Sequence, residues 1–210
     1  MNILVACEES QTVCKAFRER GHIAFSCDLQ ECSGGRPEWH ICGDCLPILN
    51  GNCFFKTQDG KNHTQYSHWD MVIAHPPCTK TSNAGARHLW SGGHLNLTRY
   101  YEGMCGKALF MAIWKCECNK VVIENPTPSL IFEFPKHSQV IQPYEYGHPV
   151  TKRTLLWVRG VPLLTPTNIV YPTQSCHDAH TWFSMGGKKR QRNRSKTFPG
   201  IAKAMAQQWG

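Results

Sequence analysis

The chain has 210 residues, of which 41% are hydrophobic and 18% charged, a balance that favours one folded domain with a sizeable core and argues against disorder. No apolar run approaches membrane-spanning length and the N-terminus reads as a strand, so we expect a soluble, cytoplasmic protein with no membrane partner. The net charge of +8 favours an anionic partner such as nucleic acid.

Twelve cysteines raise the alternatives of disulfides or a zinc site. A reducing compartment disfavours disulfides. Cys42-Gly43-Asp44-Cys45 has zinc-like spacing, but a structural zinc needs a second well-spaced pair, and Cys116-Glu117-Cys118 is a poor one. We therefore predict no metal and expect most of these thiols to be small core residues.

Short apolar runs alternate with longer stretches of helical spacing, which predicts an α/β fold with a mostly parallel, twisted sheet and helices on both faces. Near the N-terminus we expect three strands, the last of them weak, at residues 2–6, 22–27 and 40–42. Between the first two strands, residues 11–20 should form a helix that Ser10 caps and Gly21 ends.

Residues 49–67 show little periodicity and should form an irregular surface excursion. Beyond them we expect a long helix at 100–116 and strands at 69–74, 121–123, 140–141 and 154–158. Residues 160–180 read as irregular. An amphipathic helix at about 195–209, starting near Pro199, should close the chain. No linker or repeat divides the sequence, which predicts a single domain over residues 1–210.

Distinctive side chains follow the predicted strands, at the edge of an open α/β sheet where ligands bind. These residues are Cys7-Glu8-Glu9-Ser10, Asp28-Leu29, Gly43-Asp44, His75-Pro76-Pro77-Cys78 and Glu124-Asn125-Pro126. Asp28 suits ribose hydroxyls and Asp44 an adenine amino group, although either would also suit an ordinary turn. The number of such residues at one edge favours a ligand site.

Cys78 follows a double proline that stiffens the backbone, so its thiol should face a cleft, where the thiolate can add to an electron-poor ring carbon. Glu124 ends an apolar strand, and burial there should raise its pKa and permit protonation near neutral pH. The alternatives are a buried structural thiol and a carboxylate that caps a neighbouring helix.

Pro76-Pro77-Cys78-Thr79-Lys80-Thr81-Ser82 resembles the nucleophile motif of the DNA cytosine-5 methyltransferase family, a Pro-Cys with a serine four residues later. Glu124-Asn125-Pro126 resembles the family's Glu-Asn-Val element. Residues 146–158 resemble the segment that brings basic residues to the flipped base, and residues 194–208 take the place of its closing motif, which packs beside the cofactor. The whole chain is similar to short, phage-type cytosine methyltransferase-like proteins, which would act in the host cell cytoplasm if phage-encoded.

The resemblance implies a Rossmann-like class I fold that uses S-adenosylmethionine to methylate C5 of cytosine in DNA. It also implies that Cys78 adds to C6 of a flipped-out cytosine while Glu124, whose direction Asn125 and Pro126 fix, protonates or hydrogen-bonds N3. The expected cofactor-binding residues are Cys7, Glu8, Glu9, Ser10, Asp28, Leu29, Gly43, Asp44, His75 and Pro76.

Two motifs depart from the family pattern. The family has a glycine-bearing turn after the first strand, whereas this chain has no glycine before Gly21, and two acids there should repel an anionic group. The family's Gln-x-Arg-x-Arg element is replaced by residues 150–154. Contact with the cytosine or its phosphate then falls to Lys152, with Arg153 on the opposite side of the strand.

Only about 35 residues (159–193) separate the last predicted strand from residue 194, too few for the family's target-recognition domain. DNA, duplex or single-stranded, must then be held by the loop after Cys78 and by a basic run, with sequence specificity low or supplied by a separate partner. The predicted nucleic-acid contacts are Ser82, Asn83, Arg87, Lys188, Lys189, Arg190 and Arg192. Two alternatives stay open: the same chemistry on a free nucleotide or single strand, and a catalytically inactive nucleic-acid-binding homologue.

Overall fold

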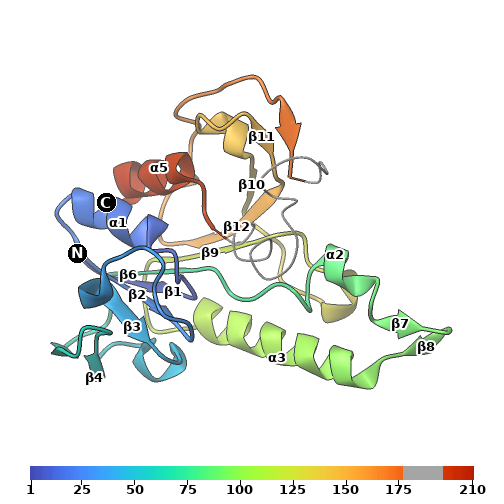
Figure 1. Cartoon of the computed structure of the whole chain (residues 1–210), viewed down its shortest axis with the longest axis horizontal. Helices are drawn as coiled ribbons and strands as arrows, with labels where there is room; N and C mark the ends of the chain where they lie inside the picture. The colour runs from blue at the N-terminus through green and yellow to red at the C-terminus, as the bar shows by residue number, and fades with distance from the viewer. Residues whose placement is uncertain (177–195) are drawn as a thin grey trace.

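A computed structural model describes residues 1–176 and 196–210. Its centre is a seven-stranded sheet of order β10-β12-β9-β6-β1-β2-β3 (Figure 1). From β9 to β3 neighbouring strands are parallel, while β12 is antiparallel to both β9 and β10. The strands are β1 (Asn2–Ala6), β2 (Ile23–Asp28), β3 (His40–Cys42), β6 (Met71–Ala74), β9 (Val121–Asn125), β10 (Gln139–Ile141) and β12 (Thr154–Arg159).

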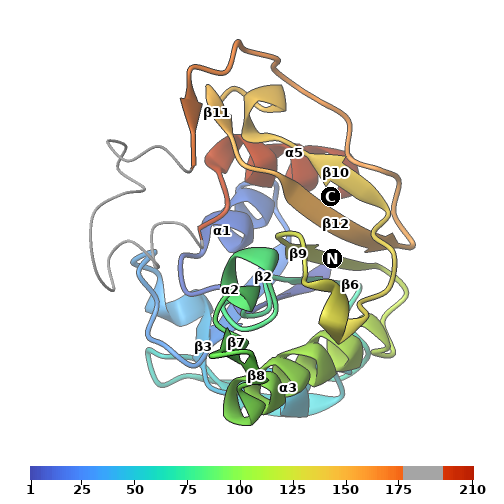
Figure 2. The ribbon, with the colours of Figure 1, turned by 90° about the vertical axis from the view of Figure 1, so that its right-hand side faces the viewer.

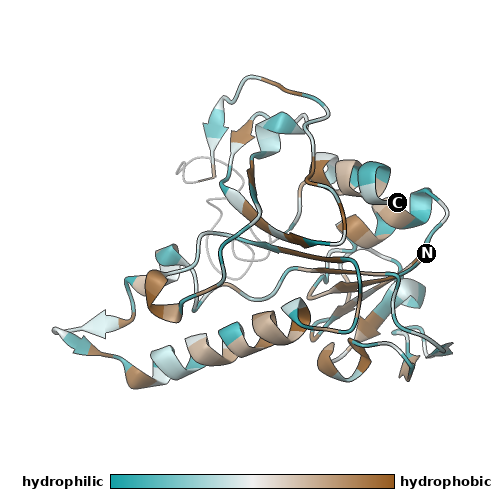
Figure 3. Ribbon diagram, turned by 180° about the vertical axis from the view of Figure 1, so that it is seen from behind, coloured by the Kyte–Doolittle hydropathy of each residue, from teal (hydrophilic) through white to brown (hydrophobic). Residues whose placement is uncertain are grey.

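The central strands are nearly continuous apolar runs, as expected for strands that are covered on both faces. Every residue of β6 is buried, as are Ile3 to Ala6 of β1, and Figure 3 shows these strands as the most hydrophobic part of the ribbon. Successive side chains of β1 point to opposite faces, so that Ile3 and Val5 join one core cluster while Leu4 and Ala6 join the other.

Helices cover both faces of the sheet, which confirms that part of the prediction. Helices α1 (Thr12–Glu19) and α5 (Pro199–Trp209) pack against each other on one face, and α3 (Leu97–Trp114) lies on the other (Figures 1 and 2). The N-terminal half of α3 extends past the sheet, beside α2 (Asn83–Ala86) and the hairpin of β7 (Trp90–Ser91) and β8 (His94–Leu95). No helix in the described ranges is long and apolar enough to span a membrane.

Two local predictions were wrong. Residues 49–67 are not irregular, because β4 (Cys53–Lys56) and β5 (Asn62–Gln65) form an antiparallel hairpin there. Ser10 is not the N-cap residue of α1: the N-cap position is Gln11, whose side chain makes no capping bond. Ser10 Oγ accepts from the first helical amide, that of Thr12, at 3.5 Å, while the next two amides bond to Glu8. Outside the main sheet, β11 (Val150–Thr151) pairs with β13 (Gln174–Ser175).

The closing helix α5 begins at Pro199, as predicted, with proline in the first turn where its missing N–H is not needed. Gly200, the next residue, approaches another part of the chain: a Cβ built on it would lie 1.9 Å from the carbonyl oxygen of Tyr146. The Gly200 amide donates to His148 Nε2 at 2.9 Å. The start of α5 is therefore fixed against the segment around Tyr146.

Candidate active site

The loops that follow the parallel strands meet at one edge of the sheet. The chain fills β1, β2 and β3 in one direction and then returns to place β6 on the other side of β1. Such a reversal leaves a crevice between the diverging loops. The His75 amide donates to Ala6 O at 3.0 Å and the Glu8 amide to Cys27 O at 3.1 Å, so the loops after β6, β1 and β2 are neighbours.

Cys78 lies in a tight turn after β6 and is partly exposed. Its carbonyl oxygen accepts hydrogen bonds from the amides of Thr81 (3.1 Å) and Ser82 (2.9 Å). The same loop pairs with the segment that follows Glu124: the Asn83 amide donates to Thr127 O, and the Ser129 amide to Thr81 O. The loops of Cys78 and Glu124 are thus bonded together directly, although 46 residues separate them in sequence (124 − 78).

Helix α3 braces the Cys78 loop from the other side. Arg99 donates through Nη2 to the carbonyl oxygens of Thr79 (3.3 Å) and Gly85 (3.1 Å), and Lys80 pairs with Glu102. Further along the helix, a Cβ on Gly106 would lie 3.2 Å from Thr81. Glycine thus allows α3 to approach the loop closely, which restricts the positions open to Cys78.

Glu124 is nearly buried and its charge is compensated. Its Oε2 accepts from His75 Nδ1 at 2.9 Å and from Thr197 Oγ1 at 3.1 Å. The side chains of His75 and Glu124 are only 9% and 12% exposed. Burial alone would raise the pKa of Glu124, but the hydrogen bond and charge of His75, with Lys152 and Thr197, outweigh it and lower the pKa to about 2. The predicted rise in the pKa of Glu124 is therefore wrong.

The pKa of His75 shifts in the opposite direction, upward. Burial disfavours its charged form, but the hydrogen bond and charge of Glu124, with the charge of Glu8, raise its pKa above the ordinary value even though Lys152 opposes them. The Nε2 atom of His75 is buried and has no hydrogen-bond partner among residues 1–176 and 196–210. His75 was predicted as a cofactor contact; the structure pairs it with Glu124. Pro76 beside it is buried.

The other three predicted catalytic residues lie in different environments. Lys152, between β11 and β12, is near enough to lower the pKa of Glu124, and its Nζ lies 5.7 Å from the ring centre of Phe198. Arg153 is exposed, because neighbouring residues of an extended chain point in opposite directions. Asn125 is buried in β9, and its Oδ1 has no partner among the described residues.

The loop after β1 contains backbone conformations that glycine favours, although it contains no glycine. Cys7 (φ 58°) and Gln11 (φ 59°) both have left-handed backbones, a conformation that L-residues adopt at a cost. Between them, the Glu8 carboxylate accepts from the amides of Val13 (2.6 Å) and Cys14 (3.2 Å) of α1. Glu8 therefore caps α1, where the sequence predicted a cofactor contact.

Glu9 and Ser10 were also predicted to contact the cofactor. Glu9 is buried, and the hydroxyl of Ser10 lies 3.1 Å from that of Thr12 in α1.

The predicted cofactor residues after β2 and β3 lie at the same edge. The amide of Gly43 donates to Asp28 O at 2.8 Å, which joins the two loops. Asp28 and Asp44 each use Oδ1 in a turn, accepting from Gln30 (2.9 Å) and Leu46 (3.0 Å). The side chain of Leu29 is 78% exposed. The turn role that sequence alone allowed for these aspartates is present, and one carboxylate oxygen of each is not used by it.

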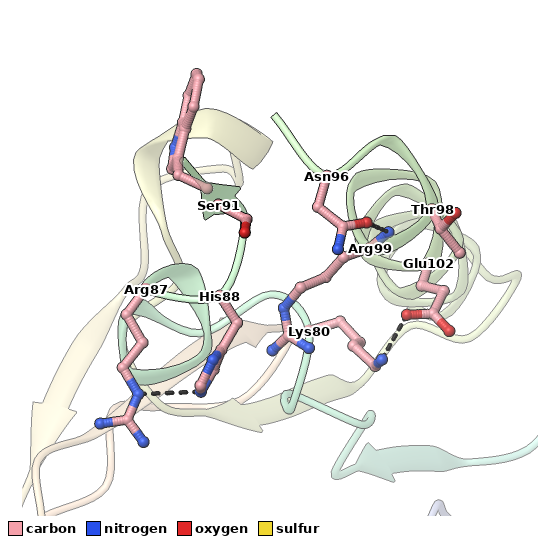
Figure 4. Close-up of a pocket in the computed structure, with 9 residues that line it drawn as sticks. Lys80, Arg87, His88, Ser91, Asn96, Thr98, Arg99 and Glu102 are labelled. Carbon is pink, nitrogen blue, oxygen red and sulfur yellow. Dashed lines mark hydrogen bonds and ion pairs between the residues drawn. The ribbon is translucent and has the colours of Figure 1, made fainter. Parts of the chain in front are cut away.

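A groove of about 640 Å³ opens beside the Cys78 loop (Figure 4). Lys80, Arg87 and Arg99 line it, and the exposed indole of Trp90 forms part of its wall. Arg87 was a predicted nucleic-acid contact, whereas Lys80 and Arg99 were not. Arg87 donates from Nε to its neighbour His88 at 3.0 Å. Glu102 also lines the groove and pairs with Lys80, so Arg87 and Arg99 carry its excess positive charge.

The remaining predicted nucleic-acid contacts have different outcomes. Asn83 is exposed. Ser82 is only 8% exposed and its hydroxyl accepts from the Gly85 amide at 3.3 Å, so it caps α2 and does not face a ligand surface. The basic run Lys188, Lys189, Arg190 and Arg192 lies outside the described residues.

Sequence reasoning missed the roles of His75 and Thr197 beside Glu124. The register of β6 and β9 pairs Ala74 with Ile123, so the next residue on each strand is His75 and Glu124. That signal was usable once the two strands were placed side by side. Thr197 carries no comparable signal, because only the return of α5 to the sheet brings it to Glu124.

No protein-family model matches this chain, and no curated protein matches its sequence. Function must therefore be inferred from the geometry of the site.

Proposed function

We propose that this protein is an S-adenosylmethionine-dependent methyltransferase of the cytosine-5 type, with a Rossmann-like catalytic fold and Cys78 as its nucleophile. One observation carries the proposal. Cys78 lies in the loop that follows β6, and Glu124 lies at the end of the adjacent parallel strand β9. Backbone hydrogen bonds join the segments after these two strands at the carboxyl edge of the sheet. A thiol and a carboxylate held in this way can act on the same ring.

The chemistry assigns a distinct task to each residue. The Cys78 thiolate would add to C6 of cytosine, which moves electron density to C5 so that C5 can take the methyl group. A base then accepts the C5 proton, and elimination of the thiolate restores the ring. Both contacts of Glu124 use Oε2, so Oε1 is the oxygen that can face the N3 edge of the base. Lys152 is near enough to Glu124 to lower its pKa, so it places a positive charge beside the site. In a duplex the base would have to be flipped out.

S-adenosylmethionine supplies the methyl group when bound, and the donor chemistry of the strand ends fits it in part. Asp28 and Asp44 each retain one carboxylate oxygen for the ribose hydroxyls and the adenine amino group. The N-terminus of α1 is a poor site for the methionine carboxylate, because Glu8 already accepts its first amides. Because both carboxylate oxygens of Glu8 are used in this way, Glu9 is the remaining acid of the loop for the methionine ammonium.

The groove beside Cys78 supports nucleic acid as the carrier of the cytosine. Its two arginines suit phosphates, whereas Lys80 is paired with Glu102, and Trp90 offers a face on which a base can stack. An open groove at the nucleophile loop suits a single strand as well as a flipped base. A second candidate function is a nucleic-acid-binding homologue without turnover, which the capping of α1 by Glu8 favours.

The test is methyl transfer, measured by mass spectrometry of nucleosides after incubation with S-adenosylmethionine and duplex DNA, single-stranded DNA or dCMP. We expect 5-methylcytosine with wild-type protein, none with Cys78→Ser, and an unchanged yield with Cys105→Ser, a matched change at an exposed thiol of α3. Calorimetry with S-adenosylmethionine separates the two candidates. No methylation on any substrate, with nucleic-acid binding intact, would reject the enzyme and favour the binding protein.

A further inference from the structure

His75 and Glu124 form a buried pair that follows the same strand ends as the proposed nucleophile. The pair follows directly from the strand register, since each residue comes one position after the matched pair Ala74 and Ile123. His75 Nδ1 lies 2.9 Å from Glu124 Oε2, and Thr197 Oγ1 lies 3.5 Å from the same nitrogen. Replacing both partners of a buried ion pair by apolar side chains is often neutral or stabilising, whereas removing only one partner is costly, so the fold itself does not require such a pair and a functional reason for it is favoured.

The pair is polarised toward Glu124. The imidazole Nε2 is buried without a hydrogen-bond partner among the described residues, so its strongest polar contact is the one to Glu124. Thr197 donates to the same carboxylate oxygen, Oε2, from the segment that precedes α5. Two donors on one oxygen hold the carboxylate in this orientation while His75 is charged and leave Oε1 for a substrate.

We propose that His75 is a positioning residue and the proton source for Glu124, so that the group acting on N3 of cytosine is the His75–Glu124 pair rather than Glu124 alone. This inference rests on the proposed function. The pair holds one proton, as imidazolium and carboxylate. A carboxylate alone could accept a hydrogen bond from the amino group of cytosine but could not protonate N3.

The proton step balances within the pair. As the Cys78 thiolate forms its bond to C6, the N–H bond at His75 Nδ1 breaks and the proton moves to Oε2 of Glu124. Rotation of the neutral carboxyl group then brings its O–H to N3, the O–H bond breaks, and N3 takes the proton. His75 ends neutral, Glu124 is a carboxylate before and after, and the negative charge brought by the thiolate is neutralised on the ring. Loss of the proton from N3 on elimination recharges the pair.

The surrounding charges favour the protonated form of His75 against the effect of its burial. Glu124 and Glu8 both favour the imidazolium, and Lys152 opposes it from the loop before β12. Glu124 in turn faces His75 and Lys152 as its charged neighbours, with Thr197 as a neutral donor. The proton on the pair is therefore lost only when the pH rises through the raised pKa of His75.

The activity test uses His75→Asn, because an asparagine amide can occupy the Nδ1 position and donate to Glu124 without titrating. Methyl transfer to cytosine is measured from pH 6 to pH 10. We expect the wild-type rate to fall at alkaline pH, and the rate of His75→Asn to be lower by about a hundredfold at pH 7, the contribution of a positioned proton donor, and to lack that alkaline decline. A wild-type rate and pH profile in His75→Asn would overturn the proposal.

A second measurement does not depend on activity. The imidazole carbon signals of His75, identified by their loss in His75→Asn, are titrated by NMR in wild type and in Glu124→Gln. We expect His75 to titrate above its ordinary 6.5 in wild type and at lower pH in Glu124→Gln. An unchanged titration would reject the pair even in an active enzyme. If the His75 titration shifts as expected in Glu124→Gln but the protein methylates no substrate, the pair stands and the cytosine chemistry is rejected, together with the role of the pair in it.

Discussion

Replacing Glu124 by glutamine should reveal how much the buried pair contributes to stability. Glutamine keeps the shape and can still accept from His75 and Thr197, so the change removes mainly the charge. The folded protein holds the pKa of Glu124 at about 2, below its ordinary 4.5. Since one pKa step is worth about 1.4 kcal/mol, the difference corresponds to roughly 3 kcal/mol of folding free energy at neutral pH.

The sign of the pH dependence follows from the direction of each shift. The pKa of Glu124 is depressed on folding, so its contribution is complete above about 4.5 and is lost as the pH falls toward 2. By pH 3 less than half of it should remain. The pKa of His75 is raised, so its contribution is complete below 6.5 and is lost as the pH rises through the higher folded value.

Urea denaturation of wild type and Glu124→Gln at pH 7, 5 and 3 measures this contribution. We expect the variant to be less stable by about 3 kcal/mol at pH 7, with the gap closing as the pH falls. Glu117→Gln is the matched control: Glu117 also faces a histidine, His68, but at 3.8 Å and on the surface, where such a pair contributes little. A pH-independent gap, or equal stability at pH 7, would refute the reasoning.

Three further predictions concern the loop, the groove and the closing helix. Cys7→Gly should change the free energy of unfolding by less than about 1 kcal/mol, because relief of the left-handed backbone offsets the loss of a side chain that packs against the core; a larger loss in urea denaturation would contradict this. Arg87→Ala should weaken binding of a fluorescent single strand and reduce its salt dependence, while Lys61→Ala on the distant β4–β5 hairpin should not; equal effects would reject the groove. Gly200→Ala should destabilise the fold by about 2 kcal/mol or more, since its Cβ would meet the Tyr146 carbonyl oxygen at 1.9 Å; an unchanged melting temperature would show that α5 can shift freely.

Much of the sheet could be predicted because its central strands are simple apolar runs. Strands β1 and β3 have the predicted bounds, and β6 and β9 lie within two residues of them. The β4–β5 hairpin is mostly polar and was missed, although Asp59-Gly60 at its turn is a usable hairpin signal, with Gly60 at φ 93°. Periodicity therefore identified buried strands and failed for an exposed pair.

The chemistry of the site was harder to predict, because it depends on contacts between distant segments. The sequence placed Cys78 and Glu124 at strand ends, but the sign of the Glu124 pKa shift depends on His75, 49 residues earlier in the chain (124 − 75). The capping of α1 was missed for a related reason. The left-handed turns at Cys7 and Gln11 return the Glu8 carboxylate to the helix, and nothing in the residue types predicts those turns.

The central claim, a Cys78 nucleophile for cytosine, is tested most directly by trapping. A 5-fluorocytosine oligonucleotide, single-stranded or duplex, cannot lose its C5 substituent as a proton, so a productive enzyme should stay bonded to it. We expect a denaturation-resistant complex in the presence of S-adenosylmethionine, with the oligonucleotide mapped by peptide mass spectrometry to Cys78. The complex should be absent in Cys78→Ser and retained in Cys105→Ser. No complex with either oligonucleotide, or one that survives in Cys78→Ser, would contradict the assignment.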